Sequence, residues 1–261
     1  DGGYAKSIHA HSDTQLSVTR AGSAAHAGAH GTAASASFAY DYVCVETQSL
    51  EAIFERVGAP IVDGVVEGFH GCVVAYGQTG AGKTYTMQGV DYDDDERGDD
   101  DDGGDVAMGG GGEVDLNAAH AGLIPRVLRR LFARVESERA RVAEAGGDAE
   151  FDVKCSYLEI YNETLRDLLM NSEYDGPAPN IREDNKRGTF VENLLEERVV
   201  GAEQTYETFL RGAANRRVGQ TNMNADSSRS HSVFTISVES RTKANPTAPV
   251  TKKSALLHLV D

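Results

Sequence analysis

The sequence predicts a three-layer α/β fold, in which helices flank a central, mostly parallel but mixed β-sheet. A glycine-rich loop at 77–84 follows a short apolar run and precedes a segment that can open a helix. Helical and strand patterns alternate over about 200 residues around this loop. A hairpin-like stretch at 180–200 indicates that the sheet is mixed and not purely parallel.

Before the loop, the sequence predicts two strands and one helix. Gln15–Arg20 alternates polar and apolar residues, and Phe38–Val43 is rich in aromatic residues. Apolar residues at helical spacing predict a helix over 49–66, with a break or kink at Pro60. We therefore expect residues 1–37 to be a poorly structured segment with one candidate strand, and residues 38–261 to form the main domain.

After the loop, the apolar pattern is lost between residues 88 and 121. Residues 91–105 contain ten acidic side chains against one basic side chain, Arg97, which is a net −9 out of the chain's −16. A charged, glycine-rich stretch without apolar periodicity predicts a disordered surface insert over about 88–121. A solvated expansion of a loop explains this composition, and an acidic docking loop or a Mg²⁺-attracting patch is the alternative.

In the rest of the chain, helical and strand patterns alternate again. Ile124–Val135 carries one apolar stripe with Pro125 in its first turn, and Phe151–Tyr161 alternates as a strand does. The full set of expected elements is a helix at 124–145, a strand at 151–161, a short helix from Asn162 to Leu169, strands at 180–182 and 189–200, a helix at 202–217, and strands at 233–240 and 255–260.

The composition argues against several classes of protein. No stretch approaches the ~18 consecutive apolar residues of a membrane span, so no membrane partner is expected. The net charge of −16 argues against binding nucleic acid through its phosphates. Three widely spaced cysteines with apolar neighbours, Cys44, Cys72 and Cys155, are interpreted as reduced core residues and not as disulfides or metal ligands.

The strongest chemical signal lies in Val73–Met87. Gly77, Gly82, Lys83 and Thr84 satisfy the phosphate-loop pattern of two glycines, a lysine and a hydroxyl residue. Glycines let the backbone coil so that its N–H groups face phosphate oxygens, and the following helix adds the positive end of its dipole. We expect Lys83 to reach the β- and γ-phosphates and Thr84 to ligate Mg²⁺. The sequence therefore predicts a nucleotide site, and a glycine-rich turn with a stray lysine is the alternative.

A second polar segment at 222–231 is dense in hydroxyl groups and carries one arginine. In a phosphate-loop protein such a segment predicts a switch that senses the γ-phosphate, although an ordinary polar loop has the same composition. The two segments and their connectors resemble the kinesin motor domain over about 38–261. The resemblance is carried by Tyr76–Met87, Asn224–His231 and Leu259–Asp261, with the connecting stretches 156–163, 166–169 and 215–217. Residues 154–157 and 256–261 look most similar to kinesins of the spindle and the plant phragmoplast.

The resemblance implies a truncated phosphate-loop NTPase fold of the kinesin type, with ATP and Mg²⁺ as cofactors. Tyr85 would lie beside adenine, Thr84 and Ser228 would ligate Mg²⁺, and Asp261 would touch it through water. The phosphate-binding residues would be Gly77, Gln78, Thr79, Gly80, Ala81, Gly82, Lys83 and Thr84. The first switch, which closes over the γ-phosphate and helps to position the attacking water, would comprise Asn224, Ser227, Ser228 and Arg229.

The function implied by the resemblance is that of an ATP-dependent microtubule motor. The full-length protein would be an ATPase that couples hydrolysis to movement along microtubules, in the cytoplasm, on the cytoskeleton and at the spindle. It would form a homo-oligomer through a coiled coil, and Lys186 and Arg187 would make a minor microtubule contact. The glycine and glutamate of a second switch, and a first strand with an Arg-x-Arg-Pro adenine contact, are not visible. We therefore expect a fragment that binds nucleotide but hydrolyses it poorly and is not motile.

Two other classes of protein are alternatives to this interpretation. A phosphate-loop GTPase or kinase would lack the Asn-x-x-Ser-Ser-Arg-Ser-His segment, and the Asn-Lys-x-Asp motif with which GTPases read the base is absent. A kinesin-like protein without ATPase activity, acting as a microtubule-binding or scaffolding module, stays open as the alternative function.

Overall fold

The computed structural model describes residues 7–19, 35–89, 116, 121–170, 176–185, 188–223 and 230–261, without the side chains of 218–223. The chain divides into two compact units, Asp1–Ser49 and Leu50–Asp261, and each is described by itself.

The first unit contains a small antiparallel sheet in the order β1-β2-β3. Its strands are β1 (Ile8–Ala10), β2 (Gln15–Thr19) and β3 (Ser35–Ala39). The strand predicted at 15–20 is present as β2. The strand predicted at 38–43 lies earlier in the chain, because Leu16 of β2 pairs with Phe38 and Thr19 pairs with Ser35.

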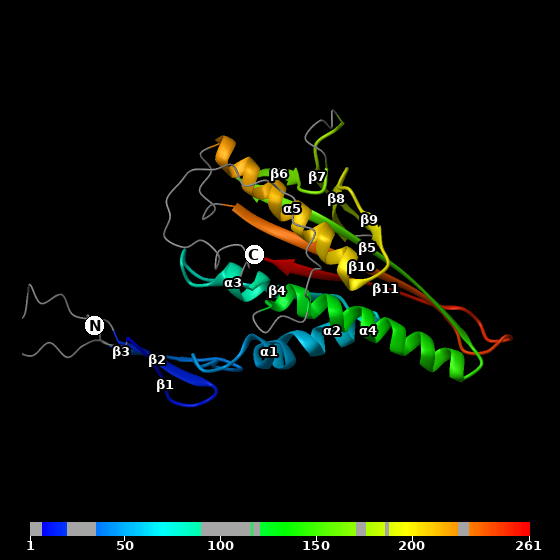
Figure 1. Ribbon diagram of the computed structural model, residues 1–261, viewed down its shortest axis with the longest axis horizontal. Coiled ribbons are helices and arrows are strands. Elements are labelled where there is room, and N and C mark those ends of the chain that lie inside the picture. The colour runs from blue at the N-terminus through cyan, green and yellow to red at the C-terminus, as the bar shows by residue number, and fades with distance from the viewer. Residues whose placement is uncertain are drawn as a thin grey trace, which may run out of the picture. The chain divides into compact units, whose positions relative to one another are not determined.

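The second unit contains a six-stranded sheet in the order β4-β11-β10-β5-β6, with β9 paired to β5 (Figure 1). The strands are β4 (Gly71–Val74), β5 (Asp148–Tyr161), β6 (Thr164–Asp167), β9 (Glu197–Val199), β10 (Ser230–Lys243) and β11 (Thr251–Val260). The expected mixed sheet is confirmed. Among the described strands only β4 and β11 pair in parallel, so the sheet contains fewer parallel pairs than expected.

The helices of the second unit are α1 (Leu50–Ile53), the π-helical η2 (Phe54–Gly58), α2 (Ala59–Glu67), α3 (Lys83–Gln88), α4 (Leu123–Glu144) and α5 (Ala202–Met223). The break predicted at Pro60 is present as the change from η2 to α2, and Pro60 lies in the first turn of α2. Proline is tolerated there because the first N–H groups of a helix have no partner within it.

Helices α2, α4 and α5 pack on one face of the six-stranded sheet. Phe209 of α5 contacts Tyr157 of β5 and Phe234 of β10, with ring centroids 5.2 and 5.3 Å apart. Helix α5 comes so close to β5 that a Cβ on Gly212 would lie 2.3 Å from Cδ1 of Tyr157. The predicted arrangement, a mixed sheet flanked by helices, is confirmed.

The short helix predicted from Asn162 to Leu169 is wrong. The segment is instead strand β6, which turns back and pairs with the end of β5. Asn162 and Glu163 have φ values of 47° and 61°, in the left-handed region. Two consecutive residues of this kind form the tight turn that joins antiparallel strands, and they cannot begin a right-handed helix.

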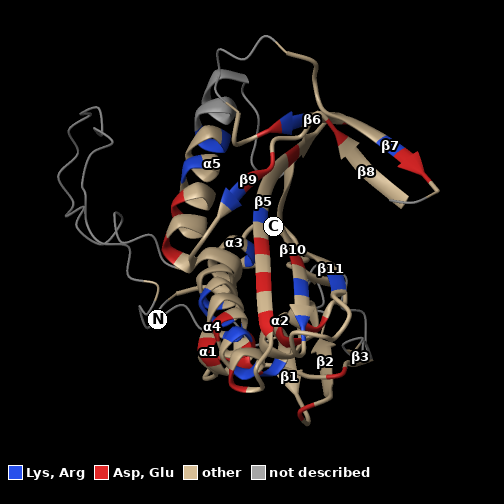
Figure 2. Ribbon diagram, turned by 90° about the vertical axis from the view of Figure 1, so that its right-hand side faces the viewer, with Lys and Arg blue, Asp and Glu red and all other residues tan. Residues whose placement is uncertain are grey.

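The predicted hairpin at 180–200 is present as β7 (Asn180–Asp184) paired with β8 (Gly188–Glu192). Figure 2 shows this hairpin projecting away from the six-stranded sheet. Lys186 and Arg187, the predicted minor microtubule contact, lie outside the described residues.

The two ends of the predicted acidic insert lie side by side. Gly89 forms an isolated β-bridge with Ala121, and Gly122 N donates to Gln88 O at 3.1 Å. Apart from Leu116, the residues between Gly89 and Ala121 lie outside the described part of the chain. The predicted disorder of this insert therefore stays a prediction.

The three cysteines have different surroundings, so the expectation that all of them belong to the core is wrong. Cys155 is buried, whereas Cys44 and Cys72 are exposed, and all three are free thiols. Burial raises the pKa of Cys155 to about 12, which keeps its thiol protonated and unreactive.

No helix among the described residues is long and apolar enough to span a membrane.

Candidate functional site

The phosphate loop lies between β4 and α3, as the sequence predicts. Gly80 and Gly82 have φ values of 79° and 81°, a left-handed conformation that glycine adopts at little cost. Thr86 closes the first turn of α3, because both its backbone N–H and its hydroxyl donate to Gly82 O at 2.9 Å. The loop therefore leads directly into the helix that carries Lys83 and Thr84.

The Lys83 ammonium folds back over the loop that precedes it. Its Nζ donates to the carbonyl oxygens of Gly77 and Gln78 at 3.1 Å each. Both acceptors are neutral, and Lys83 is half-buried. An anion that enters the loop can therefore recruit this cation without first breaking an ion pair.

Asp261 lies beside the loop because β11 runs parallel to β4. Val260 pairs with Val74, and Ala75 N donates to Val260 O at 3.0 Å. The carboxyl ends of neighbouring parallel strands meet at one edge of a sheet, where α/β proteins bind their ligands. There the Thr84 hydroxyl donates to the Asp261 carboxylate, at 3.0 Å from Oδ2 and 3.3 Å from Oδ1.

A cavity of about 840 Å³ opens over the loop. Its volume falls within the range of about 300–1,000 Å³ that is usual for ligand sites. The loop and α3 line one side. The other side is formed by Tyr157, Ala213, Arg216, Arg217, Ser230, His231, Val260 and Asp261.

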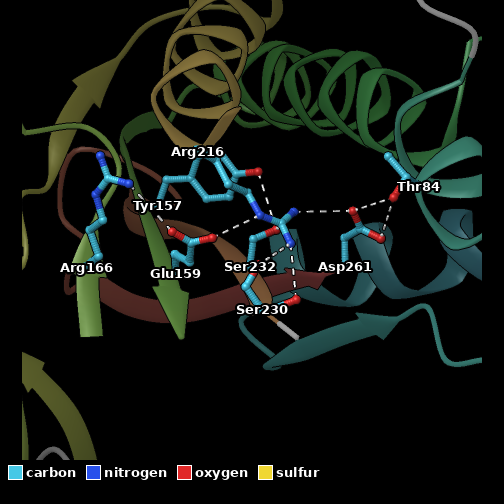
Figure 3. A network of polar contacts seen from close by, with 8 residues as sticks. All are labelled: Thr84, Tyr157, Glu159, Arg166, Arg216, Ser230, Ser232 and Asp261. Atoms are coloured by element: carbon cyan, nitrogen blue, oxygen red, sulfur yellow. Dashed lines mark hydrogen bonds and ion pairs between the residues drawn. The ribbon is translucent and has the colours of Figure 1, made fainter. Parts of the chain in front are cut away.

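A buried cluster of polar side chains lies beside this cavity, and Arg216, Ser230 and Asp261 of the cluster line it (Figure 3). The Arg216 side chain, 12% exposed, extends from α5 between Glu159 and Asp261, which are each 7% exposed. Its Nε lies 3.4 Å from Oε1 of Glu159, and its Nη1 lies 3.6 Å from Oδ2 of Asp261. Together with Ser230 and Ser232 of β10, these three residues are called the arginine cluster.

The same guanidinium holds the first residues of β10. Nη1 of Arg216 donates to Oγ of Ser232 at 3.0 Å, and Nη2 donates to the carbonyl oxygen and Oγ of Ser230 at 3.2 and 3.1 Å. Tyr157 donates its hydroxyl to Oγ of Ser232 at 3.4 Å. Burial raises the pKa of Tyr157, so its hydroxyl keeps the proton that it donates.

The structure brings part of the predicted site together. Tyr85 is half exposed at the cavity, and Thr84 meets Asp261 there. The predicted phosphate residues that line the cavity are Gly77, Gln78, Thr79, Gly80, Gly82, Lys83 and Thr84, whereas Ala81 is not among the lining residues. The predicted switch residues lie outside the described part of the chain; they are Asn224, Ser227, Ser228 and Arg229.

Sequence reasoning missed Arg216 and Glu159 as site residues, although a periodic signal was available for each. Glu159 continues the alternating series of Phe151, Val153, Cys155 and Tyr157, which faces the core. Arg216 lies one helical turn beyond Ala213 on the face of α5 that Phe209 buries. A charged residue at a core-facing position of each element indicates a buried ion pair.

Comparisons with known proteins agree with this geometry. The family model of the kinesin motor domain matches residues 5–261. The kinesin-like protein KIN-12E of Oryza sativa subsp. japonica is 43% identical over 205 residues, which are 78% of this chain and 10% of that protein. The kinesin-like protein KIF15 of Mus musculus is 37% identical over 226 residues, which are 86% of this chain and 14% of that protein.

A solved structure of a fast kinesin is also similar. It superposes with a TM-score of 0.73 at 32% identity, over 98% of this chain and 58% of that one. The chain thus spans a small part of the curated relatives described above and somewhat more than half of the solved kinesin chain. The chain belongs to the kinesin motor domain family.

Proposed function

We propose that this chain binds Mg-ATP in the cavity over the phosphate loop. One observation carries the proposal: Thr84 contacts Asp261 at the carboxyl ends of two parallel strands, beside a glycine loop over which Lys83 folds back. The donor set fits the ligand, because an ammonium group suits phosphate oxygens, and hydroxyl and carboxylate oxygens suit Mg²⁺. The cavity volume of about 840 Å³ is sufficient for a ligand of this class.

In this proposal the loop residues 77–84 hold the phosphates, and Lys83 leaves its two carbonyl acceptors for the β- and γ-phosphates. Thr84 and Ser228 ligate Mg²⁺, and Asp261 approaches it through water. Tyr85, 48% exposed at the cavity, provides a ring beside adenine. When bound, Mg²⁺ neutralises charge that develops on the phosphates.

We further propose that Asn224, Ser227, Ser228 and Arg229 act as the first switch and position the attacking water. The longer protein that contains this chain would hydrolyse ATP and move along microtubules, with tubulin as its partner and the microtubule cytoskeleton as its location. The loop between β7 and β8, with Lys186 and Arg187, would add a minor microtubule contact. Membership of the kinesin motor domain family supports each of these points.

The nucleotide site is tested by titrating a fluorescent ATP analogue, in the presence of Mg²⁺, against the wild type and Lys83→Ala. We expect the variant to bind at least about tenfold more weakly, because it lacks the cation that pairs with the phosphates. The matched control is Lys252→Ala, which removes an exposed lysine of β11 away from the cavity. Equal affinity of the wild type and Lys83→Ala would contradict the assigned site.

The motor activity is tested on the longer protein, by measuring its ATPase rate with and without microtubules. Stimulation by microtubules supports the motor proposal. Binding to microtubules without ATP hydrolysis would instead support the alternative, a module that binds or scaffolds microtubules.

A further inference from the structure

Arg216 lies where the predicted first switch joins the rest of the domain. Residues 224–229 connect the end of α5 to Ser230, the first residue of β10. Arg216 belongs to α5 and donates to both the carbonyl oxygen and the hydroxyl of Ser230. One side chain therefore ties together the two elements between which residues 224–229 run.

The same side chain also reaches the residue that meets Thr84. Asp261 receives a hydrogen bond from Thr84 on one side and faces Nη1 of Arg216, 3.6 Å away, on the other. A continuous series of contacts thus leads from the phosphate loop through Asp261 and Arg216 to the start of β10 (Figure 3). The distance between the loop and β10 along the chain gives no indication of this link.

Glu159 confines the guanidinium to this position. Both side chains are almost buried, and a buried charge is costly unless opposite charges and hydrogen bonds compensate it. Glu159 lies 3.4 Å from Nε of Arg216 and 3.8 Å from Nη1 of Arg166, which is 41% exposed. With Nε facing Glu159, both terminal nitrogens of Arg216 are available for Asp261 and the two serines of β10.

We propose that Arg216, oriented by Glu159, is a positioning residue of the nucleotide site. It fixes the Asp261 carboxylate beside Thr84 and anchors the first residues of β10, Ser230 and Ser232. The inference rests on the proposed Mg-ATP site, because Asp261, which contacts Arg216, is proposed to approach Mg²⁺ there. Its consequence is that Arg216 matters for nucleotide binding chiefly when Mg²⁺ is present.

The first experiment separates the Mg²⁺-dependent part of nucleotide affinity. The dissociation constant of a fluorescent ATP analogue is measured with Mg²⁺ and with EDTA, for the wild type, Arg216→Lys and Glu159→Gln. Lysine keeps the charge but lacks the planar fork that serves several acceptors at once. We expect Arg216→Lys to weaken binding at least about tenfold with Mg²⁺ and less than about threefold with EDTA. With Mg²⁺, the dissociation constant of Glu159→Gln should lie between those of the wild type and Arg216→Lys.

The matched control is Arg211→Lys, the same substitution on the same helix. Arg211 contacts Glu197 of β9 at 2.5 Å, is 51% exposed and does not line the cavity. We expect its affinities to equal those of the wild type with Mg²⁺ and with EDTA. If Arg216→Lys also binds like the wild type in both conditions, or loses affinity equally in both, the inference is overturned. If the wild type itself shows no Mg²⁺-dependent binding, the proposed function fails, and the inference fails with it.

The second experiment needs no nucleotide and therefore tests the anchoring alone. Backbone hydrogen exchange of residues 230–233 is measured in the wild type, Arg216→Lys, Glu159→Gln and Arg211→Lys. We expect exchange about tenfold faster in this segment for Arg216→Lys, a smaller increase for Glu159→Gln and no change for the control. Residues 236–238, in the middle of β10, should exchange at the wild-type rate in every variant. Wild-type exchange at residues 230–233 in Arg216→Lys would overturn the inference even if the nucleotide site itself is correct.

Discussion

Arg211 and Arg216, little more than one turn apart on α5, each contact a glutamate on a strand of the same sheet. The exposed pair, Arg211 with Glu197, is the shorter at 2.5 Å, whereas the buried pair, Arg216 with Glu159, is 3.4 Å long. Arg216, however, also contacts Asp261 and two serines. Distance alone would therefore rank the contributions of the two pairs to stability in the wrong order.

The comparison teaches that burial and the number of partners decide what an ion pair contributes. Water screens an exposed pair, and ordering two long side chains offsets much of the attraction. A buried pair is screened less, and removing one partner leaves the other charge without compensation. A third pair, Asp63 with Arg130, is intermediate in exposure and has the best geometry, with Nε to Oδ1 at 3.0 Å and Nη2 to Oδ2 at 2.7 Å.

The largest effect is expected for Glu159→Leu. The variant leaves Arg216 without its nearest carboxylate in a buried site, so we expect the free energy of unfolding to fall by about 3 kcal/mol. Urea unfolding monitored by circular dichroism measures this loss. The control is the double variant Glu159→Leu/Arg216→Met, which removes both charges and should recover part of the loss. A double variant as unstable as the sum of the two single variants would show that the pair is not coupled.

An intermediate effect is expected for Asp63→Asn. Asp63 of α2 contacts both Arg130 and Arg134 of α4, and its side chain is 31% exposed. Because solvent screens these pairs in part, we expect a loss of about 1 kcal/mol at pH 7, measured by urea unfolding. A loss as large as that of Glu159→Leu would contradict the ranking by burial.

The loss of unfolding free energy caused by Asp63→Asn should also depend on pH. The hydrogen bond from Arg130 is the main cause that lowers the pKa of Asp63 in the folded protein. A lowered folded-state pKa stabilises the protein above the pKa of the unfolded state, and this contribution is lost as the pH falls through the folded-state value. The difference between the wild type and Asp63→Asn should thus be constant above about pH 5 and should narrow below it. If the difference in unfolding free energy grew as the pH fell, the lowered pKa of Asp63 would be contradicted.

The smallest effect is expected for Arg211→Ala. The ion pair with Glu197 is short but exposed, so we expect the free energy of unfolding to change by no more than about 0.5 kcal/mol. Urea unfolding at low and high salt measures the change and its screening. A loss near that of Glu159→Leu would remove the distinction between the exposed and the buried ion pair of α5.

The parts of the fold that depend on local sequence could be predicted. The phosphate loop is contained in one short segment, and β10, β11, α4 and α5 have clear apolar periods. Their existence could be predicted, and so could the start of α5 and the end of β11, whereas their other ends lie elsewhere than expected. The stretch after Asn162 was misassigned because leucines at 165, 168 and 169 also fit a helical period. Two left-handed residues decided the structure, and a pattern of apolar residues does not reveal them.

The arginine cluster could not be predicted in the same way. Glu159, Arg216 and Asp261 come from β5, α5 and the end of β11, and their proximity depends on strand register and on how closely α5 approaches the sheet. The register places Ser232 opposite Glu159, and Gly212 permits the close approach of the helix. A sequence pattern can mark each charge as core-facing, but only the packed sheet and helix show which charges meet.

The bridge between Gly89 and Ala121 has a consequence for how the protein can vary. Because these two residues are already held together, the chain between them closes a ring whose entropic cost depends only weakly on its length. Doubling the number of residues in such a ring costs only about 0.6 kcal/mol. Away from Leu116, which is buried in the core and accepts a hydrogen bond from Arg129 of α4, evolution can therefore lengthen or recharge this segment at little cost. An experimenter can use the same position to insert a fluorescent reporter close to the nucleotide cavity.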